Sequence, residues 1–60
     1  MNNLVKVLMD REVMSEHDVV EWIDLAASGW RAHPDHTLEV MLYEEFGVEP
    51  DYLFDLIEFL

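Results

Sequence analysis

The residues that could bind a metal ion are concentrated in the segment His33-Pro34-Asp35-His36, with His17 elsewhere in the chain. Two histidines and an aspartate within four residues could ligate Zn²⁺, because imidazole nitrogen and carboxylate oxygen are both zinc ligands. The chain has no cysteine, Pro34 stiffens the segment, and no spacing specifies a fourth ligand. We therefore interpret the segment as a polar turn whose Asp35 caps the next helix, and expect no metal site.

The groups needed for nucleophilic catalysis are scarce. There is no cysteine and only one threonine, Thr37; of the two serines, Ser15 is explained as a helix cap and Ser28 as a helix-surface residue. Carboxylates are so frequent that a pair such as Glu44 and Glu45 carries no special weight as general acid and base. A chain of sixty residues seldom forms a cleft that excludes water and holds a nucleophile beside its base. The sequence therefore predicts a non-enzymatic protein without a cofactor.

The charge of the chain restricts its partners. Fourteen acidic residues face three basic ones, which gives a formal net charge of −11 with neutral histidines, and no Lys or Arg follows Arg31. This charge argues against direct binding to nucleic acid, because phosphates would be repelled and few counterions displaced. No apolar run approaches the roughly 18 residues of a membrane span, and the first residues lack a secretory signal pattern. We expect a cytoplasmic protein that attracts a basic partner.

The elements that would position these residues are helices. Hydrophobic periodicity predicts one small acidic domain over residues 1–60, an all-α bundle of three to four short helices. In the first segment, Asn3 could cap a helix with Leu4, Val5, Leu8 and Met9 on one face. Alternatively Val5, Val7 and Met9 alternate as in a strand. No second strand is available within one chain, so helix is favoured unless two copies pair across a dimer.

The second segment is the clearest helix. Ser15 is expected to cap it with Asp18 as the capping-box partner, and we expect the helix to fray near Gly29. One arc of the helix carries its apolar residues: Val19, Val20, Trp22, Ile23, Ala26, Ala27 and Trp30.

The third helix is predicted to start near Asp35 or Thr37 and to end at Phe46, before Gly47. Its apolar residues lie on two faces. One face carries Leu38, Leu42 and Phe46, and the other carries Val40 and Tyr43.

The fourth helix opens with Pro50 in its first turn. One broad apolar face carries Tyr52, Leu53, Leu56, Ile57, Phe59 and Leu60. Behind that face lies a narrow acidic stripe of Asp51, Asp55 and Glu58, with Phe54 at the boundary.

Not every apolar residue can be buried, because a domain of this size hides only about 60% of the surface of its unfolded chain. The residues expected to stay exposed are Phe54, Tyr43, Val40 and the pair Phe59 and Leu60. An exposed aromatic patch surrounded by acids is typical of a binding surface. Homodimerisation would also hide this surface.

The leading hypothesis is an interaction protein that binds and blocks a basic, nucleic-acid-binding surface of another protein. Carboxylates would take the place of phosphates and accept hydrogen bonds from Arg and Lys. The carboxylates expected to do so are Glu39, Glu44, Glu45, Asp51, Asp55 and Glu58. Tyr43 and Phe54 are the expected aromatic anchors. The alternatives are a helix-in-groove adaptor acting through residues 50–60 and an obligate homo-oligomeric subunit.

No specific family is recognised. In size, acidity and lack of catalytic groups the chain is similar to the small inhibitors that bacteriophages make against host defence or transcription, which include anti-CRISPR proteins and DNA-mimic antirestriction proteins. This compositional resemblance implies a blocking function and assigns no residues. Residues 51–60 resemble the acidic-hydrophobic tails by which phage replication and transcription proteins hold a sliding clamp.

Overall fold

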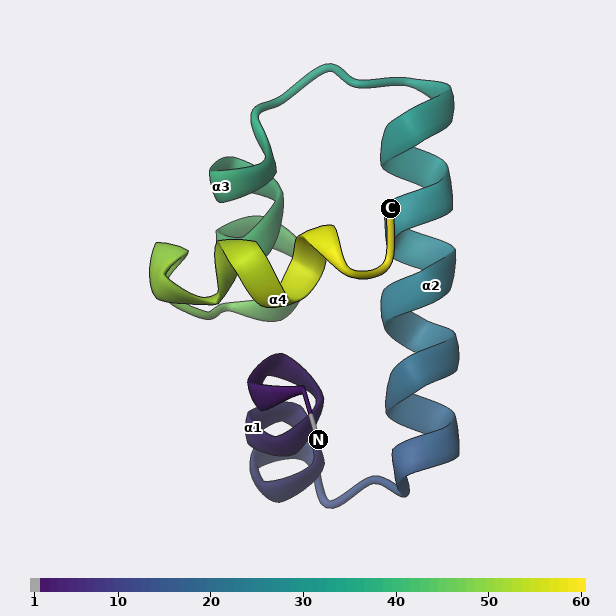
Figure 1. Cartoon of the computed structure of the whole chain (residues 1–60), viewed down its shortest axis with the longest axis vertical. Helices are drawn as coiled ribbons and strands as arrows, with labels where there is room; N and C mark the ends of the chain where they lie inside the picture. Colours follow the sequence, from purple (N-terminus) through teal and green to yellow (C-terminus); the bar gives the residue numbers. More distant parts are fainter. Residues whose placement is uncertain (1) are drawn as a thin grey trace.

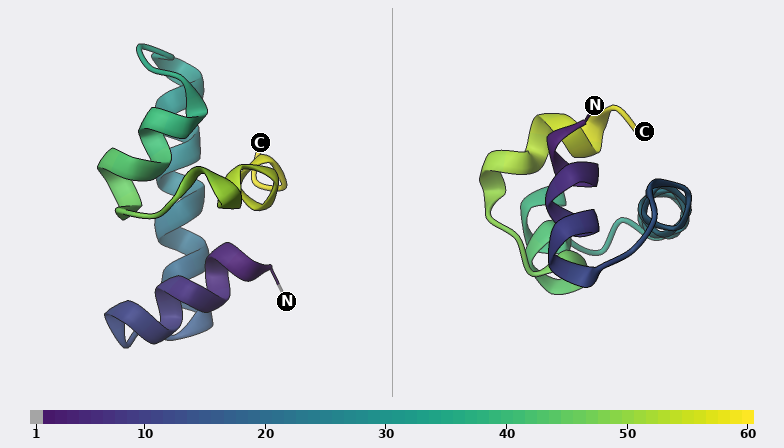
Figure 2. Two further views of the ribbon diagram at one scale, coloured as in Figure 1. Left: turned by 90° about the vertical axis from the view of Figure 1, so that its left-hand side faces the viewer. Right: turned by 90° about the horizontal axis from the view of Figure 1, so that it is seen from below.

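A long helix, α2 (Glu16–Ala32), organises the fold. In the computed structural model, which describes residues 2–60, the shorter helices α1 (Asn3–Glu12), α3 (Leu38–Met41) and α4 (Leu53–Ile57) lie along one side of α2 (Figure 1). Views from two further directions show the same arrangement, with α1 crossing near the start of α2 (Figure 2). The predicted all-α bundle is confirmed, and none of the described residues forms a strand.

Two helical turns of other types extend the short helices. A π-helical turn, η1 (Leu42–Phe46), continues α3, and a 3-10 turn, η2 (Pro50–Tyr52), leads into α4. The α3–η1 segment is therefore one continuous helical rod whose last turn is wider than the first. Pro50 opens η2, as its position in the sequence predicted.

The first segment is helical, so the favoured prediction of a helix is confirmed and the alternative of a strand is wrong. Its cap is Asn2 rather than the predicted Asn3. The Asn2 side-chain oxygen accepts hydrogen bonds from the backbone N–H groups of Leu4 (2.9 Å) and Val5 (3.2 Å). Leu4, Val5 and Leu8 are buried on one helix face, and this packing favours the helix without requiring a second copy.

The start of α2 was predicted correctly and its end was not. The Ser15 hydroxyl accepts a hydrogen bond from the Asp18 backbone N–H (3.2 Å), which is the expected cap. The helix does not fray at Gly29 but continues for three more residues to Ala32. Its last turn is tied to the following loop, because the Trp30 indole N–H donates to the His36 carbonyl (2.6 Å).

The cap of the α3–η1 rod is Thr37, whose hydroxyl accepts from the Val40 N–H (3.3 Å). The prediction that Asp35 caps this helix was wrong, because the helix begins only at Leu38. The rod ends at Gly47, which has φ +66°. Residues with a Cβ atom are strained in this left-handed region, so glycine suits the stop. Leu42 and Phe46 are buried whereas Tyr43 is exposed, which confirms the two-faced pattern.

The core is formed by one face of each helix. Along α2 its residues recur every four positions and form a single row. The buried apolar residues are Leu4, Val5, Leu8, Val19, Ile23, Ala27, Met41, Leu42, Phe46, Val48 and Leu56. Trp22 is half-buried and meets the Phe46 ring edge-on, with ring centroids 5.0 Å apart.

Three apolar residues lie differently from the prediction. Val20 and Ile57, both placed on inward faces, are exposed, and Phe59, expected at the surface, packs half-buried against the core. Since α4 ends at Ile57, the chain continues as a tight turn in which the Phe59 N–H donates to the Leu56 carbonyl (2.9 Å). The turn changes the direction of the following side chains relative to a continuing helix. Phe54 and Leu60 are exposed, as expected.

Candidate functional site

The eight residues predicted to contact a partner are not brought together in one site. Glu39 and Tyr43 line a groove beside η1. Glu44 and Glu45 line a separate hollow that faces the end of α2. The remaining four line neither depression; they are Asp51, Phe54, Asp55 and Glu58.

The groove beside η1 has a volume of about 460 Å³, and most of its lining residues are apolar. The left-handed turn at Gly47 reverses the chain, so that residues 48–50 come back against the outer face of the α3–η1 rod. The apolar part of the lining comprises Val40, Tyr43, Val48 and Pro50. Tyr43 is 73% exposed, so its ring is available to a bound group.

Gly47 and two acidic residues, Glu39 and Glu49, complete this lining. Both acidic residues are exposed. Neither carboxylate forms a hydrogen bond or ion pair with another residue in the range 2–60, in contrast to Glu44, Glu45 and Glu58. The groove therefore combines an apolar wall with two carboxylates that have no partner in this part of the chain.

Sequence reasoning found Glu39, Val40 and Tyr43 but missed the contribution of residues 48–50 to the site. Positions 39, 40 and 43 share a face of the rod through their helical spacing. The sequence did contain a signal for residues 48–50, since a helix stop at Gly47 followed by Pro50 requires the chain to turn back. The face of the rod that these residues cover could not be predicted, because it depends on packing between separate segments.

The second hollow, of about 360 Å³, uses its carboxylates within the protein. Glu44 Oε2 lies 3.7 Å from His36 Nε2, and Glu45 Oε1 accepts a long hydrogen bond from the Trp22 indole N–H (3.4 Å). His33 also lines the hollow. Across residues 2–60, however, no three His, Asp or Glu side chains are placed to hold a metal ion.

The acidic stripe of the C-terminal segment has a partly structural role. The Asn2 side-chain amide donates to the Glu58 carboxylate and to the Asp55 backbone carbonyl (2.9 Å), which joins the start of α1 to α4. Asp51 is exposed, and Phe54 is 79% exposed. Of the four predicted contact residues here, Glu58 is thus engaged inside the protein.

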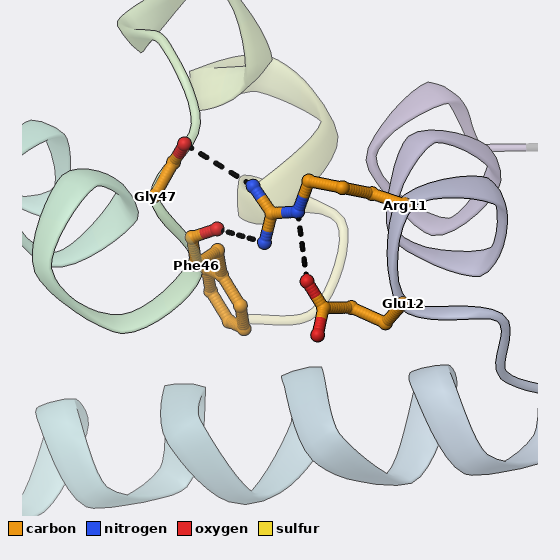
Figure 3. A network of polar contacts seen from close by, with 4 residues as sticks. All are labelled: Arg11, Glu12, Phe46 and Gly47. Carbon is orange, nitrogen blue, oxygen red and sulfur yellow. Dashed lines mark hydrogen bonds and ion pairs between the residues drawn. The ribbon is translucent and has the colours of Figure 1, made fainter.

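Both arginines also act within the protein. Arg11 donates through Nη1 to the Gly47 carbonyl (3.2 Å) and through Nη2 to the Phe46 carbonyl, while its Nε contacts Glu12 (2.9 Å) (Figure 3). Arg31 donates to the Leu60 carbonyl (3.3 Å) and to the Ser28 hydroxyl (3.2 Å). Four of these five interactions satisfy carbonyl or hydroxyl oxygens, so the arginines neutralise few of the carboxylates.

Comparison with known proteins gives no relative to guide the assignment: no family model, curated protein or solved structure matches this chain. None of the helices within residues 2–60 is long and apolar enough to cross a membrane.

Proposed function

We propose that this chain is a non-enzymatic interaction protein that binds a basic, nucleic-acid-binding surface of another protein and blocks it. Its carboxylates would occupy the positions of phosphates and accept hydrogen bonds from arginine and lysine. We expect the chain to act in the cytoplasm. Its size, acidity and lack of catalytic groups, which are similar to those of phage-made inhibitors, support a blocking function.

The observation that carries this proposal is the number of carboxylates left without a partner. Five of the fourteen acidic side chains contact another described residue: Glu12, Glu21, Glu44, Glu45 and Glu58. The other nine make no hydrogen bond or ion pair within residues 2–60: Asp10, Glu16, Asp18, Asp24, Asp35, Glu39, Glu49, Asp51 and Asp55. Like charges on so small a body oppose its compaction and attract an oppositely charged surface.

Exposed aromatic rings add an apolar component to this surface. Tyr43 and Phe54 are the most exposed aromatic residues of the chain. Aromatic side chains in the middle of an interface lose water on binding and contribute much of its affinity. We therefore expect the carboxylates to steer the encounter and the rings to slow dissociation.

The helix-in-groove alternative would require α4 to leave its own core. Leu56, one of the residues that would enter a partner's groove, is fully buried, and Leu53 is half-buried against the same core. Residues 50–60 therefore have less apolar surface to offer than their sequence pattern indicated. The homo-oligomeric alternative stays a prediction, for which self-association of the isolated chain is the measurement.

The test isolates partners with the tagged chain from the native lysate and releases them with rising salt. We expect a nucleic-acid-binding protein that elutes at moderate salt and loses its nucleic acid when the chain is added. A partner that resists high salt, or one that keeps its nucleic acid, would contradict the proposal.

A pair of matched variants then locates the surface. The double reversal Glu39→Lys and Asp51→Lys changes carboxylates of the proposed surface. The control, Asp10→Lys and Asp24→Lys, produces the same change in net charge on α1 and α2. We expect the first variant to weaken binding at least tenfold more than the control while far-ultraviolet circular dichroism stays the same. Equal losses would show that only net charge matters.

A further inference from the structure

We propose that the groove beside η1 is a subsite for one arginine side chain of a basic partner. This inference rests on the proposed function and adds to it the identity of the group that is bound. It concerns the groove lined by Glu39, Val40, Tyr43 and residues 47–50.

The wall of the groove suits the aliphatic part of a long side chain. Val40, Val48 and Pro50 offer carbon surface, and arginine buries its methylene stem on such surface while its charged end stays polar. A short or purely charged group would leave this wall exposed to water.

The Tyr43 ring suits the planar end of the same side chain. Guanidinium groups are attracted to the faces of aromatic rings, and they stack on them better than a compact ammonium group does. No cation of the chain competes for this ring among the residues described. Arg11 reaches Gly47 of the groove lining, but it donates to the carbonyls of Phe46 and Gly47.

The two carboxylates determine the charge of the occupant. Glu39 and Glu49 belong to the same groove and are without hydrogen bonds inside the described chain. Arginine has five N–H donors in a fixed plane, so it can bind carboxylates at its edge while its face lies on an aromatic ring. Lysine presents a strongly hydrated point charge and cannot make both interactions in this way.

The experiment is a titration of the full chain followed by amide ¹H–¹⁵N chemical shifts. Three short peptides are used that are identical except for arginine, lysine or citrulline at one position; citrulline has the shape of arginine but no charge. We expect the arginine peptide to shift the amides of residues 39–43 and 47–49. Its affinity should exceed that of the lysine peptide about threefold to tenfold, and the citrulline peptide should bind least.

Variants connect the shifts to the groove. Tyr43→Ala and Glu49→Gln should each reduce the affinity for the arginine peptide at least threefold, and Tyr43→Phe should retain it. Leu25→Ala is the matched control, because it removes an exposed apolar side chain of α2 that lies outside the groove, and we expect it to leave the affinity unchanged.

Several results would overturn the inference. Equal affinity for arginine and lysine would leave only general charge attraction, and equal affinity for citrulline would indicate an apolar occupant. Shifts of the groove amides on dilution without peptide would identify a second copy of the chain as the occupant. If any of these is seen while a salt-sensitive, nucleic-acid-binding partner is still captured and blocked, the arginine subsite is wrong and the proposed function stands. Selective arginine binding without such a partner would support the arginine subsite and contradict the proposed function.

Discussion

Replacing Arg11 with alanine removes the guanidinium group that connects α1 to the end of the α3–η1 rod. This side chain donates to the carbonyls of Phe46 and Gly47, at a helix end where carbonyl groups have no intrahelical partners. The positive charge also lies at the negative end of the helix dipole. We expect the variant to be clearly less stable than the native chain.

The size of this effect follows from the contacts. A hydrogen bond from a charged donor contributes about 1.5–3 kcal/mol when it is well shielded, but here water can replace part of the lost bonding because the side chain is partly exposed. Because of this exposure, we expect the loss of two such bonds and of the dipole interaction to lower the free energy of unfolding by about 2 kcal/mol. In a domain of this size that lowers the melting temperature by roughly 8–16 °C.

The assay is thermal unfolding followed by circular dichroism, with Arg31→Ala as the control. Both variants change the net charge equally, so their difference excludes the general effect of added repulsion. Arg31 bonds to Leu60 and Ser28 at exposed positions, and we expect its loss to reduce stability by about 0.5 kcal/mol or less. Arg11→Lys should lie between native and alanine, because it keeps the charge and loses the planar fork.

The reasoning fails if Arg11→Ala and Arg31→Ala melt at the same temperature. Arg11 would then contribute only its charge, and the contacts drawn in Figure 3 would not stabilise the fold. A lysine variant as unstable as alanine would instead show that the planar geometry carries the whole effect.

Two further predictions test the core and the backbone. Leu56→Ala should cost about 2–5 kcal/mol because the side chain is fully buried, whereas Ile57→Ala should cost about 1 kcal/mol or less; similar midpoints in urea unfolding would show that α4 packs differently. Alanine at the two glycines should act in opposite directions on the melting temperature. Gly29→Ala should stabilise by about 0.5–1 kcal/mol, since the glycine is inside a helix with open space around it, and Gly47→Ala should destabilise by about 1 kcal/mol, since it is held at φ +66°. A Gly47→Ala variant as stable as the native chain would argue against the left-handed turn.

The parts of the fold that depend on local chemistry could be predicted from the sequence. Ser15 and Thr37 cap helices because their hydroxyls accept backbone N–H groups a few residues ahead. Gly47 stops a helix because the stop requires a positive φ. The hydroxyls of Ser15 and Thr37 bond to nearby backbone groups, and Gly47 acts through its own backbone conformation. Each of these features is therefore contained in a short stretch of sequence.

The errors occur at helix ends whose side chains contact residues outside their own helix. Gly29 favours an early helix end by its own propensity, but the indole of Trp30 is held by His36 in the next loop and the helix continues. Asn2 rather than Asn3 caps α1, and its side chain also reaches α4 near the other end of the chain. The periodicity of apolar residues within one helix gives no information about such contacts between separate segments.

The same distinction applies to the candidate site. Glu39 and Tyr43 are one helical turn apart, so their common face could be inferred from spacing. That Glu45 would contact Trp22, and Glu58 would contact Asn2, depends on the packing of separate elements. Acidic residues that look equivalent in the sequence therefore divide into those that contact other residues of the fold and those that make no such contact within residues 2–60.

Repulsion among the carboxylates opposes the folding of this acidic chain. Arg11 and Arg31 stabilise it through carbonyl and hydroxyl groups, so most of the repulsion among the carboxylates remains in the free protein. Salt screens this repulsion over about 8–10 Å, and the whole molecule measures only 29 × 20 × 17 Å, so near neighbours still repel. A basic partner would remove the repulsion as well as forming contacts, and a ligand that binds only the folded state stabilises that state. Added salt thus favours folding of the free chain and opposes the proposed complex, so the charge that weakens the isolated domain is the same charge that would hold its partner.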